Sequence, residues 1–318
     1  MDEKNITRIT MIHLLGFQIY PSMRFVVLFL FLIVYCVTIC GNLLIITLVS
    51  YSKSLHCPMY FFLSQLSVSD IIIVTDILPN MLHAVLVKET IISLCGCLIQ
   101  FLFFAISEAS QCLLLTVMSY ERYLAICKPL HYSSIMSHRL CWMTILTFWI
   151  LSISIELCHT LILSQLDFCG LNIIDHYFCD LHPILELSCS DTTIVELEVT
   201  LVGGVLVIIP FFVIIVSYVY IIVAIFNIPS ITGRQKGFST CSSQLSVVST
   251  YYGTMVCTYL VPGDGQTRSI SKFFSLLYTI VTPSMNPIIY SLRNRDLKKV
   301  IEKLINNFLS LQNNRNTF

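Results

Sequence analysis

The chain has 318 residues, of which 56% are apolar and 11% are charged, and its mean hydropathy is +0.83. Soluble domains carry about a quarter charged residues, so this composition excludes an ordinary soluble protein and indicates one whose solvent is lipid. The formal net charge of zero argues against nucleic-acid binding, which requires a basic surface.

Seven long apolar runs follow one another, separated by short polar stretches. A helix that crosses a bilayer needs roughly 20 mostly apolar residues. The runs do not alternate apolar and polar positions as a membrane barrel does, so we expect these runs to form helices rather than strands. The sequence predicts an all-α membrane protein with an extracellular segment 1–24, a seven-helix transmembrane bundle 25–292 and a cytoplasmic tail 293–318. The predicted helices are 25–49, 58–87, 97–126, 140–166, 199–226, 238–260 and 273–292.

The basic residues predict the orientation, because Lys and Arg are retained on the cytoplasmic side. With the amino terminus outside, twelve Lys and Arg lie in inner segments and six in outer segments. The long outer stretch 167–191 is acidic and has no Lys or Arg. The sequon at Asn5 falls on the same outer side and predicts glycosylation there. We therefore expect a plasma-membrane protein whose first helix acts as its own insertion signal.

The tail has an amphipathic pattern. Apolar residues recur every three or four positions, and basic residues fill the other face. This predicts a short helix lying on the inner leaflet, with an ordinary tail helix in water as the alternative. The apolar positions are Leu297, Val300, Ile301, Leu304, Ile305 and Phe308, and the polar positions are Arg295, Lys298, Lys299, Glu302 and Lys303.

Several motifs occur in a fixed order over nearly the whole chain. They are Gly41-Asn42, LHCPMY at 55–60, LSVSD at 66–70, MSYERYLAIC at 118–127 followed by KPLHY, Ser217-Tyr218, KGFSTCSS at 236–243 and PSMNPIIYSLRN at 283–294. With these motifs the chain resembles the vertebrate odorant receptors, a family of rhodopsin-like G-protein-coupled receptors.

The sequence departs from that family's pattern at several positions. Gln111 stands where many members have Glu, which weakens the case for a sodium-binding pair with Asp70. The other departures are Glu121 for Asp, Gly237 for Ala, Gln244 for His and Ser284-Met285 for Met-Leu.

The resemblance implies a receptor that binds a small volatile odorant within the helix bundle and activates a stimulatory heterotrimeric G protein, in the cilia of olfactory neurons. It implies no enzymatic activity and no cofactor. The alternatives are a rhodopsin-like receptor for a non-odorant molecule and a membrane transporter, although half-helices and repeated halves are lacking. A retinal photoreceptor needs a lysine in the seventh helix, and Lys272 lies before its predicted start.

Intramembrane polar residues predict a switch, because such groups are costly in lipid and usually functional. Asn42, Asp70 and Asn286 can form one polar cluster, beside a helix bend at Pro287. Glu121 can hold Arg122 at rest, and a released Arg122 could meet two tyrosine hydroxyls and a G protein. The alternatives are a purely structural network and a snorkelling arginine. The predicted coupling residues are Asp70, Glu121, Arg122, Tyr218, Asn286, Pro287 and Tyr290.

Four cysteines lie in predicted outer segments, where bridges are expected to form. Cys97 opens the third helix, and Cys169, Cys179 and Cys189 lie in the acidic stretch. Four cysteines allow three pairings, and the sequence alone leaves them open. The family resemblance implies Cys97–Cys179 and Cys169–Cys189, with Cys95 as a competitor of Cys97.

The same stretch gathers His176, Cys179, Asp180 and His182 within seven residues. These side chains suit copper or zinc, but a cysteine in a disulfide is not a thiolate ligand. Ordinary loop polarity is the favoured interpretation, so we predict no metal.

The ligand site is predicted in the outer half of the bundle, around Glu108. Glu108 precedes Arg122 by fourteen residues, which is roughly 21 Å along a helix. A buried carboxylate needs a partner or a proton. Glu108 can be neutral, can pair with His159, or can contact a cationic ligand such as an amine. The predicted contacts are Phe104, Ala105, Glu108, Cys112, Val202, Leu206, Tyr252, Met255, Tyr259, Leu276 and Thr279.

Overall fold

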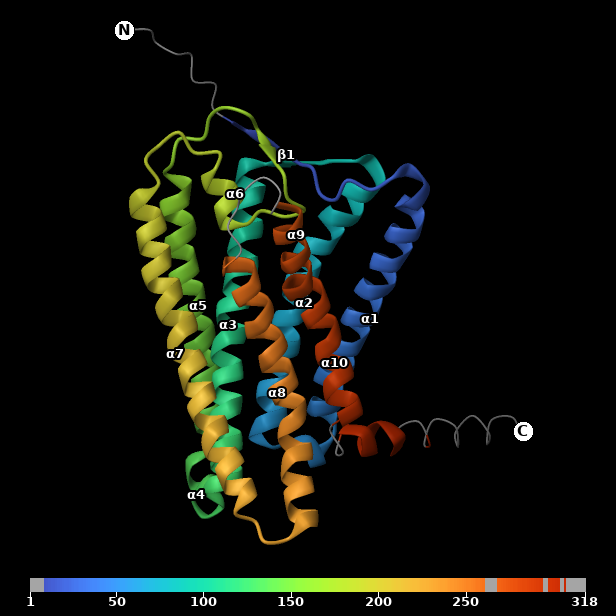
Figure 1. The fold of residues 1–318 in the computed structure, drawn as a ribbon, viewed down its shortest axis with the longest axis vertical. Helices are drawn as coiled ribbons and strands as arrows, with labels where there is room; N and C mark the ends of the chain where they lie inside the picture. The colour runs from blue at the N-terminus through green and yellow to red at the C-terminus, as the bar shows by residue number, and fades with distance from the viewer. Residues whose placement is uncertain (1–8, 261–267, 294–296, 304–305, 307–318) are drawn as a thin grey trace, which may run out of the picture.

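The computed structural model describes residues 9–260, 268–293, 297–303 and 306. Within them, seven long helical segments run side by side along the long axis of the molecule, as predicted (Figure 1). Two short helices, α4 (Pro129–Ile135) and α6 (Leu181–Leu185), lie in connections at opposite ends. The seven segments are α1 (Arg24–Tyr51), α2 (Pro58–Val87), α3 (Leu94–Cys127), α5 (His138–Ser164), α7 (Thr193–Phe226), α8 (Ile231–Leu260) and the pair α9 (Arg268–Leu276) and α10 (Thr282–Arg293).

Local sequence signals set several helix ends. Pro58 occupies the first turn of α2, where no intrahelical N–H bond is needed. The hydroxyl of Ser93 caps α3 by accepting the Gly96 N–H at 3.0 Å, and Ser137 caps α5 by accepting the Leu140 N–H at 3.3 Å. α2 ends at Val87, and the next residue, Lys88, has a left-handed φ of 82° that stops the helix.

Three helices begin earlier than the apolar runs predict. α3 begins at Leu94, α7 at Thr193 and α8 at Ile231, whereas the predicted starts were 97, 199 and 238. Hydropathy marks only the part of a helix that lipid surrounds, and a helix can continue into water with polar residues. The extra turns of α7 carry Glu196 and Glu198 into the helix.

The seventh segment differs most from its prediction. It begins at Arg268 rather than 273, so Lys272 lies inside α9. A π-helical stretch, Leu277–Val281, joins α9 to α10, and the Thr282 hydroxyl donates to the Leu277 carbonyl at 3.0 Å. π-bulges break helical regularity, so this segment has an irregular point before the predicted one at Pro287.

Five segments are, within the described residues, long and apolar enough by themselves to cross a membrane: α1 with its preceding turn, α2, α3, α5 and α7. α8 is less apolar because Ser, Thr and Tyr recur along it, and the last segment is divided by its π-helical stretch. Large apolar side chains on α1, α5 and α7 point outward, as lipid contact requires.

The described residues also contain three short strands, all outside the apolar runs. A small sheet caps one end of the bundle, with β1 (Met11–Leu14) between β2 (Thr90–Ser93) and β3 (Ile173–Ile174). β1 pairs antiparallel with β2, with Met11 opposite Ser93, and parallel with β3, with His13 opposite Ile173. These strands lie in the connections and are too short to show a periodicity in the sequence.

The amphipathic tail helix is present over 297–303 and leaves the foot of α10 sideways (Figure 1). Leu297 is completely buried, and Val300 and Ile301 pack against the inner part of the core. Lys298 and Lys299 are exposed on its other face. The predicted positions Leu304, Ile305 and Phe308 lie outside the described residues.

Candidate ligand pocket and coupling site

A buried carboxylate ties three helices together at mid-depth. Asp70 of α2 is completely buried and accepts from Gln111 of α3 at 3.0 Å. Asn286 of α10 donates to both Asp70 oxygens, at 3.2 and 3.0 Å. Asn42 does not join this cluster, because its amide donates instead to the Thr38 and Pro283 carbonyls at 3.0 and 3.3 Å. α2, α3 and α10 therefore meet at one group, and α1 joins α10 separately.

Arg122, near the carboxyl-terminal end of α3, is held by its neighbour Glu121. Its Nε lies 3.5 Å from Oε2 of Glu121, and Oε1 of Glu121 accepts from the Tyr132 hydroxyl of α4 at 2.6 Å. The buried Tyr218 and Tyr290 lie close enough to interact with Arg122 electrostatically. Among the described residues, its ion pair is nevertheless with Glu121.

One hydrogen bond joins α3 to α8 near this arginine. The Gln244 amide donates to the Ser119 hydroxyl at 3.3 Å, and Gln244 is completely buried. Ser119 precedes Arg122 by almost one helical turn. This bond therefore connects the two helices beside the predicted coupling residues.

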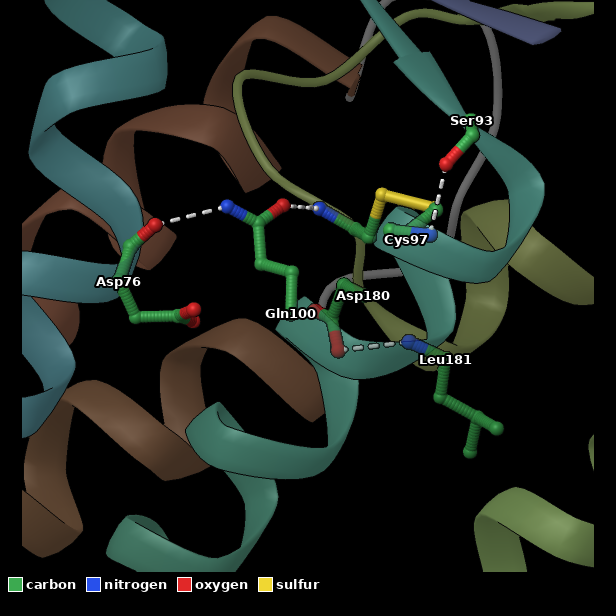
Figure 2. The surroundings of a disulfide bond; sticks show 8 residues. Asp76, Ser93, Cys97, Gln100, Asp180 and Leu181 are labelled. Atoms are coloured by element: carbon green, nitrogen blue, oxygen red, sulfur yellow. Dashed lines mark hydrogen bonds between the residues drawn. A yellow bond between two sulfur atoms is a disulfide. The ribbon is translucent and has the colours of Figure 1, made fainter.

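Two disulfides hold the opposite end, Cys97–Cys179 and Cys169–Cys189, the pairing that the family resemblance implied. Cys95 is a free, exposed thiol. Figure 2 shows the buried Gln100 beside the first bond, between α2 and the loop. Its amide donates to the Asp76 carbonyl at 2.9 Å, and its oxygen accepts the Cys179 N–H at 3.0 Å. Gln100 thus fixes the loop to α2 and α3.

A second set of contacts fixes the segment after β1. The ammonium of Lys272 in α9 donates to Asp175 at 2.5 Å and to the Gly16 carbonyl at 3.2 Å. Gly16 has a φ of +61°, which suits a residue without a side chain. Next to it, the ring of Phe17 stacks on Tyr177 with centroids 5.2 Å apart. The amino-terminal segment, the loop and α9 therefore form one cap.

The predicted ligand contacts fall into two neighbouring groups. Under the cap, Thr279 shares a hydrogen bond with the Tyr177 hydroxyl at 2.9 Å, and Phe104 packs edge-on against Phe178 at 5.1 Å. Deeper in the bundle, the Cys112 thiol lies 3.0 Å from the Tyr252 hydroxyl and donates to the Leu206 carbonyl at 3.2 Å.

The remaining contacts lie around these groups. The Tyr251 hydroxyl donates to the Glu108 carbonyl at 3.1 Å, which places Glu108 of α3 beside α8. Met255 is buried with the deeper group, Leu276 packs under the cap, Ala105 packs in the outer core, and Val202 is half-buried on α7. The side chain of Tyr259 and the sequon residue Asn5 lie outside the part that the structure describes.

Comparison with known proteins identifies the family. A family model described as olfactory receptor matches residues 31–307. The chain is 46% identical to mouse olfactory receptor 1M1, over 98% of this chain and 99% of that one. It is 44% identical to human olfactory receptor 1M1, over 96% and 98% of the two chains. A squid rhodopsin crystal structure shares the fold, with a TM-score of 0.73 at 17% identity, over 90% of this chain and 82% of that one.

The chain belongs to the olfactory receptor family. This olfactory receptor is therefore a multi-pass membrane protein of the G-protein-coupled class, with a rhodopsin-like fold, and not an enzyme.

One of the three alternatives for Glu108, a pair with His159, is not found among the described residues of the receptor. Nδ1 of His159 lies 3.1 Å from Glu156 on the same helix, and Nε2 lies 3.2 Å from Glu198 of α7. The earlier start of α7 brings Glu198 into reach. Both ring nitrogens therefore lie within ion-pair distance of carboxylates other than Glu108.

The predicted position of Lys272 was wrong, because Lys272 lies within the seventh segment of the receptor and not before it. Its ammonium is engaged by Asp175 and Gly16 in the cap. A Schiff-base lysine needs a free amine facing a ligand, whereas the Lys272 amine is held in the cap. These contacts therefore argue against a retinal photoreceptor.

The loop residues considered for a metal do not converge. His176 is buried, His182 is 77% exposed and Cys179 is in a disulfide. The described residues contain no group of three or more side chains suited to a metal ion.

Three residues that organise the receptor were missed as site residues: Gln100, Gln244 and Lys272. An amide in an apolar run is a weak signal, because its partner is a backbone or a helix far away in sequence. In the sequence, Gln244 stands out only as a departure from the family pattern.

The cap of the receptor predicts a pH dependence centred on His176. Burial, assisted by nearby Lys272, lowers the pKa of His176 to about 3. An unfolded histidine titrates near a pKa of about 6.5. Between these values the unfolded chain binds one more proton than the folded one, so stability falls as pH decreases below about 6.5.

We therefore expect His176→Phe to flatten the fall in thermal-inactivation temperature of the purified receptor between about pH 6.5 and 4. His182→Gln is the matched control, because His182 is exposed in the same loop. Equal pH slopes in the wild type and His176→Phe would contradict the assignment.

Proposed function

We propose that the receptor binds a small volatile odorant among the outer halves of α3, α7, α8 and the last segment, and then activates a stimulatory heterotrimeric G protein. The observation that carries this proposal is the arrangement along α3. Predicted ligand contacts from three other helices gather around Phe104 and Cys112, and Arg122 lies at the opposite end. One helix thus links the two sites.

The proposed orientation places the disulfide-bonded cap outside and the tail helix at the cytoplasmic face. The boundaries are an extracellular segment 1–24 with glycosylated Asn5, the bundle 25–292 and the tail 293–318. The charge asymmetry supports this, and disulfides suit an oxidising exterior. The proposed location is the plasma membrane of olfactory cilia.

The proposed mechanism shifts a two-state equilibrium, as an agonist must. At rest, Glu121 holds Arg122, and Gln244 joins α8 to Ser119 of α3. Ligand held between α3 and α8 favours a second state in which the inner half of α8 moves away. Arg122 can then meet Tyr218, Tyr290 and the G protein.

The test is a panel of volatile and non-volatile small molecules applied to cells that express the receptor with a stimulatory G protein, with cyclic AMP as the readout. We expect at least one ligand to raise cyclic AMP without net uptake. Arg122→Ala should reach the surface and lose this response, because its five-donor guanidinium is removed. A full agonist response in that variant would refute the coupling role. Responses confined to non-volatile ligands would favour a receptor for another small molecule, and net uptake would favour a transporter.

The bond between α3 and α8 gives a second prediction. A neutral hydrogen bond contributes about 1 kcal/mol, which corresponds to about a fivefold change in an equilibrium. Gln244→Leu keeps the side-chain volume and removes the donor, so ligand-independent cyclic AMP should rise by up to about fivefold. Leu245→Ala is the control, because Leu245 is 40% exposed on the same helix. Unchanged basal signalling at equal surface expression would count against this tie.

Glu108 gives a prediction about ligand class. The charged groups that interact with it electrostatically are two further carboxylates, Asp180 and Glu156. His159, the candidate partner of Glu108, pairs instead with Glu156 and Glu198. No ion pair to Glu108 is found within the described part of the chain. A ligand cation, such as a protonated amine, would be attracted by this acidic surrounding.

We expect Glu108→Gln to weaken amine agonists selectively and to leave neutral odorants unaffected, measured as the concentration for half-maximal cyclic AMP. Glu186→Gln, which removes a carboxylate in the exposed part of the loop, is the matched control. If every agonist keeps its potency in Glu108→Gln at normal surface expression, Glu108 is not a ligand contact.

A further inference from the structure

An apolar groove lies on the outside of the bundle, away from both sites described above. Its walls, Val37, Leu44 and Ile288, are 46%, 47% and 38% exposed, so it opens outward. Its floor is buried. The floor residues are Ile45 and Leu48 of α1, at 3% exposure each, and Leu297 of the tail helix, at 0%.

A glycine shapes this groove. A Cβ added to Gly41 would lie 2.9 Å from Cβ of Pro287, so α1 and α10 approach as closely as they do only without that side chain. Both residues line the groove. Its narrow part therefore lies where α1 meets the proline of α10.

In a membrane this groove would face lipid. α1 and α10 belong to the helix bundle, and residues of the tail helix line the end of the groove. The groove therefore lies in the leaflet on the side of the tail helix. Under the orientation in the proposed function, on which this inference rests, that is the inner leaflet. Every lining residue is apolar, so an occupant must present hydrocarbon.

The tail helix adds charge beside this hydrocarbon surface. Leu297 and Ile301 line the groove, whereas Lys298, Lys299 and Lys303 are exposed with one acid, Glu302. One helix thus presents apolar residues to the groove and a net positive face at the membrane surface. Basic residues near a membrane surface attract anionic headgroups.

We propose that this groove binds an anionic phospholipid of the inner leaflet. One acyl chain lies along Leu44, Ile45 and Ile288, and the headgroup phosphate pairs with Lys298 and Lys299. The lipid bridges α1, α10 and the tail helix. It thereby stabilises the end of the segment that carries Asn286 and Pro287.

The test uses the full-length receptor in nanodiscs of phosphatidylcholine with a minor fraction of phosphatidylserine. Lipids retained after extraction are counted by native mass spectrometry. We expect the wild type to retain phosphatidylserine above its proportion in the disc. Each lysine near the surface contributes about fivefold, so Lys298→Gln with Lys299→Gln should remove most of this enrichment. Lys88→Gln is the charge control, because Lys88 is exposed at the opposite end.

A second pair of variants tests the hydrocarbon part. Leu44→Trp should fill the groove and reduce retention of phosphatidylserine while leaving both lysines in place. Leu43→Trp is its matched control, because Leu43 is a neighbour with 49% exposure that does not line the groove. Correct folding of each variant is checked by its thermal-inactivation temperature.

Several outcomes would overturn the proposal. Retention of both lipids in the proportions of the disc, or no effect of the double lysine variant, would refute the headgroup site. Loss of enrichment in the lysine variant but not in Leu44→Trp would mean surface attraction without a groove-bound chain. The measurement needs no odorant and no G protein, so failure of the proposed function would leave its result unchanged.

Discussion

Burial of the Asp70 carboxylate is the constraint on which the arrangement of the helices depends. A charged or polar group at this depth cannot turn to water, so its hydrogen bonds must come from other helices. Gln111 and Asn286 provide them, from α3 and α10. Three helices that are distant in sequence are therefore held at one point. The bond between Asn42 and the Pro283 carbonyl adds α1 by the same principle.

The two ends of the bundle are held in different ways. The end that carries the cap has two disulfides, a small sheet, Gln100 with both halves of its amide engaged and the Lys272–Asp175 pair. The opposite end, around Arg122, has single, breakable contacts, namely Arg122 with Glu121 and Gln244 with Ser119. This asymmetry fits the proposed function, in which the ligand end is organised in advance and the G-protein end opens.

Much of the fold could be predicted because lipid imposes a simple rule on composition. Long apolar runs must be helices, and all seven were placed from hydropathy alone. The rule says nothing about where a helix continues into water, so the starts of α7 and α8 were late and Lys272 was placed outside its helix. Hydropathy also does not predict the cap, because there β1 pairs with strands far away in sequence.

The sequence by itself determined the membrane class, the number of helices and the positions of Asp70, Arg122 and the four bridged cysteines. Only the tertiary structure decided which groups these residues meet. His159 binds Glu156 and Glu198 instead of Glu108, and Asn42 binds a carbonyl of the last segment instead of Asp70. The physical reason is that a buried polar group takes whichever partner packing brings within about 3 Å. That choice depends on helix rotation and length, which hydropathy does not encode.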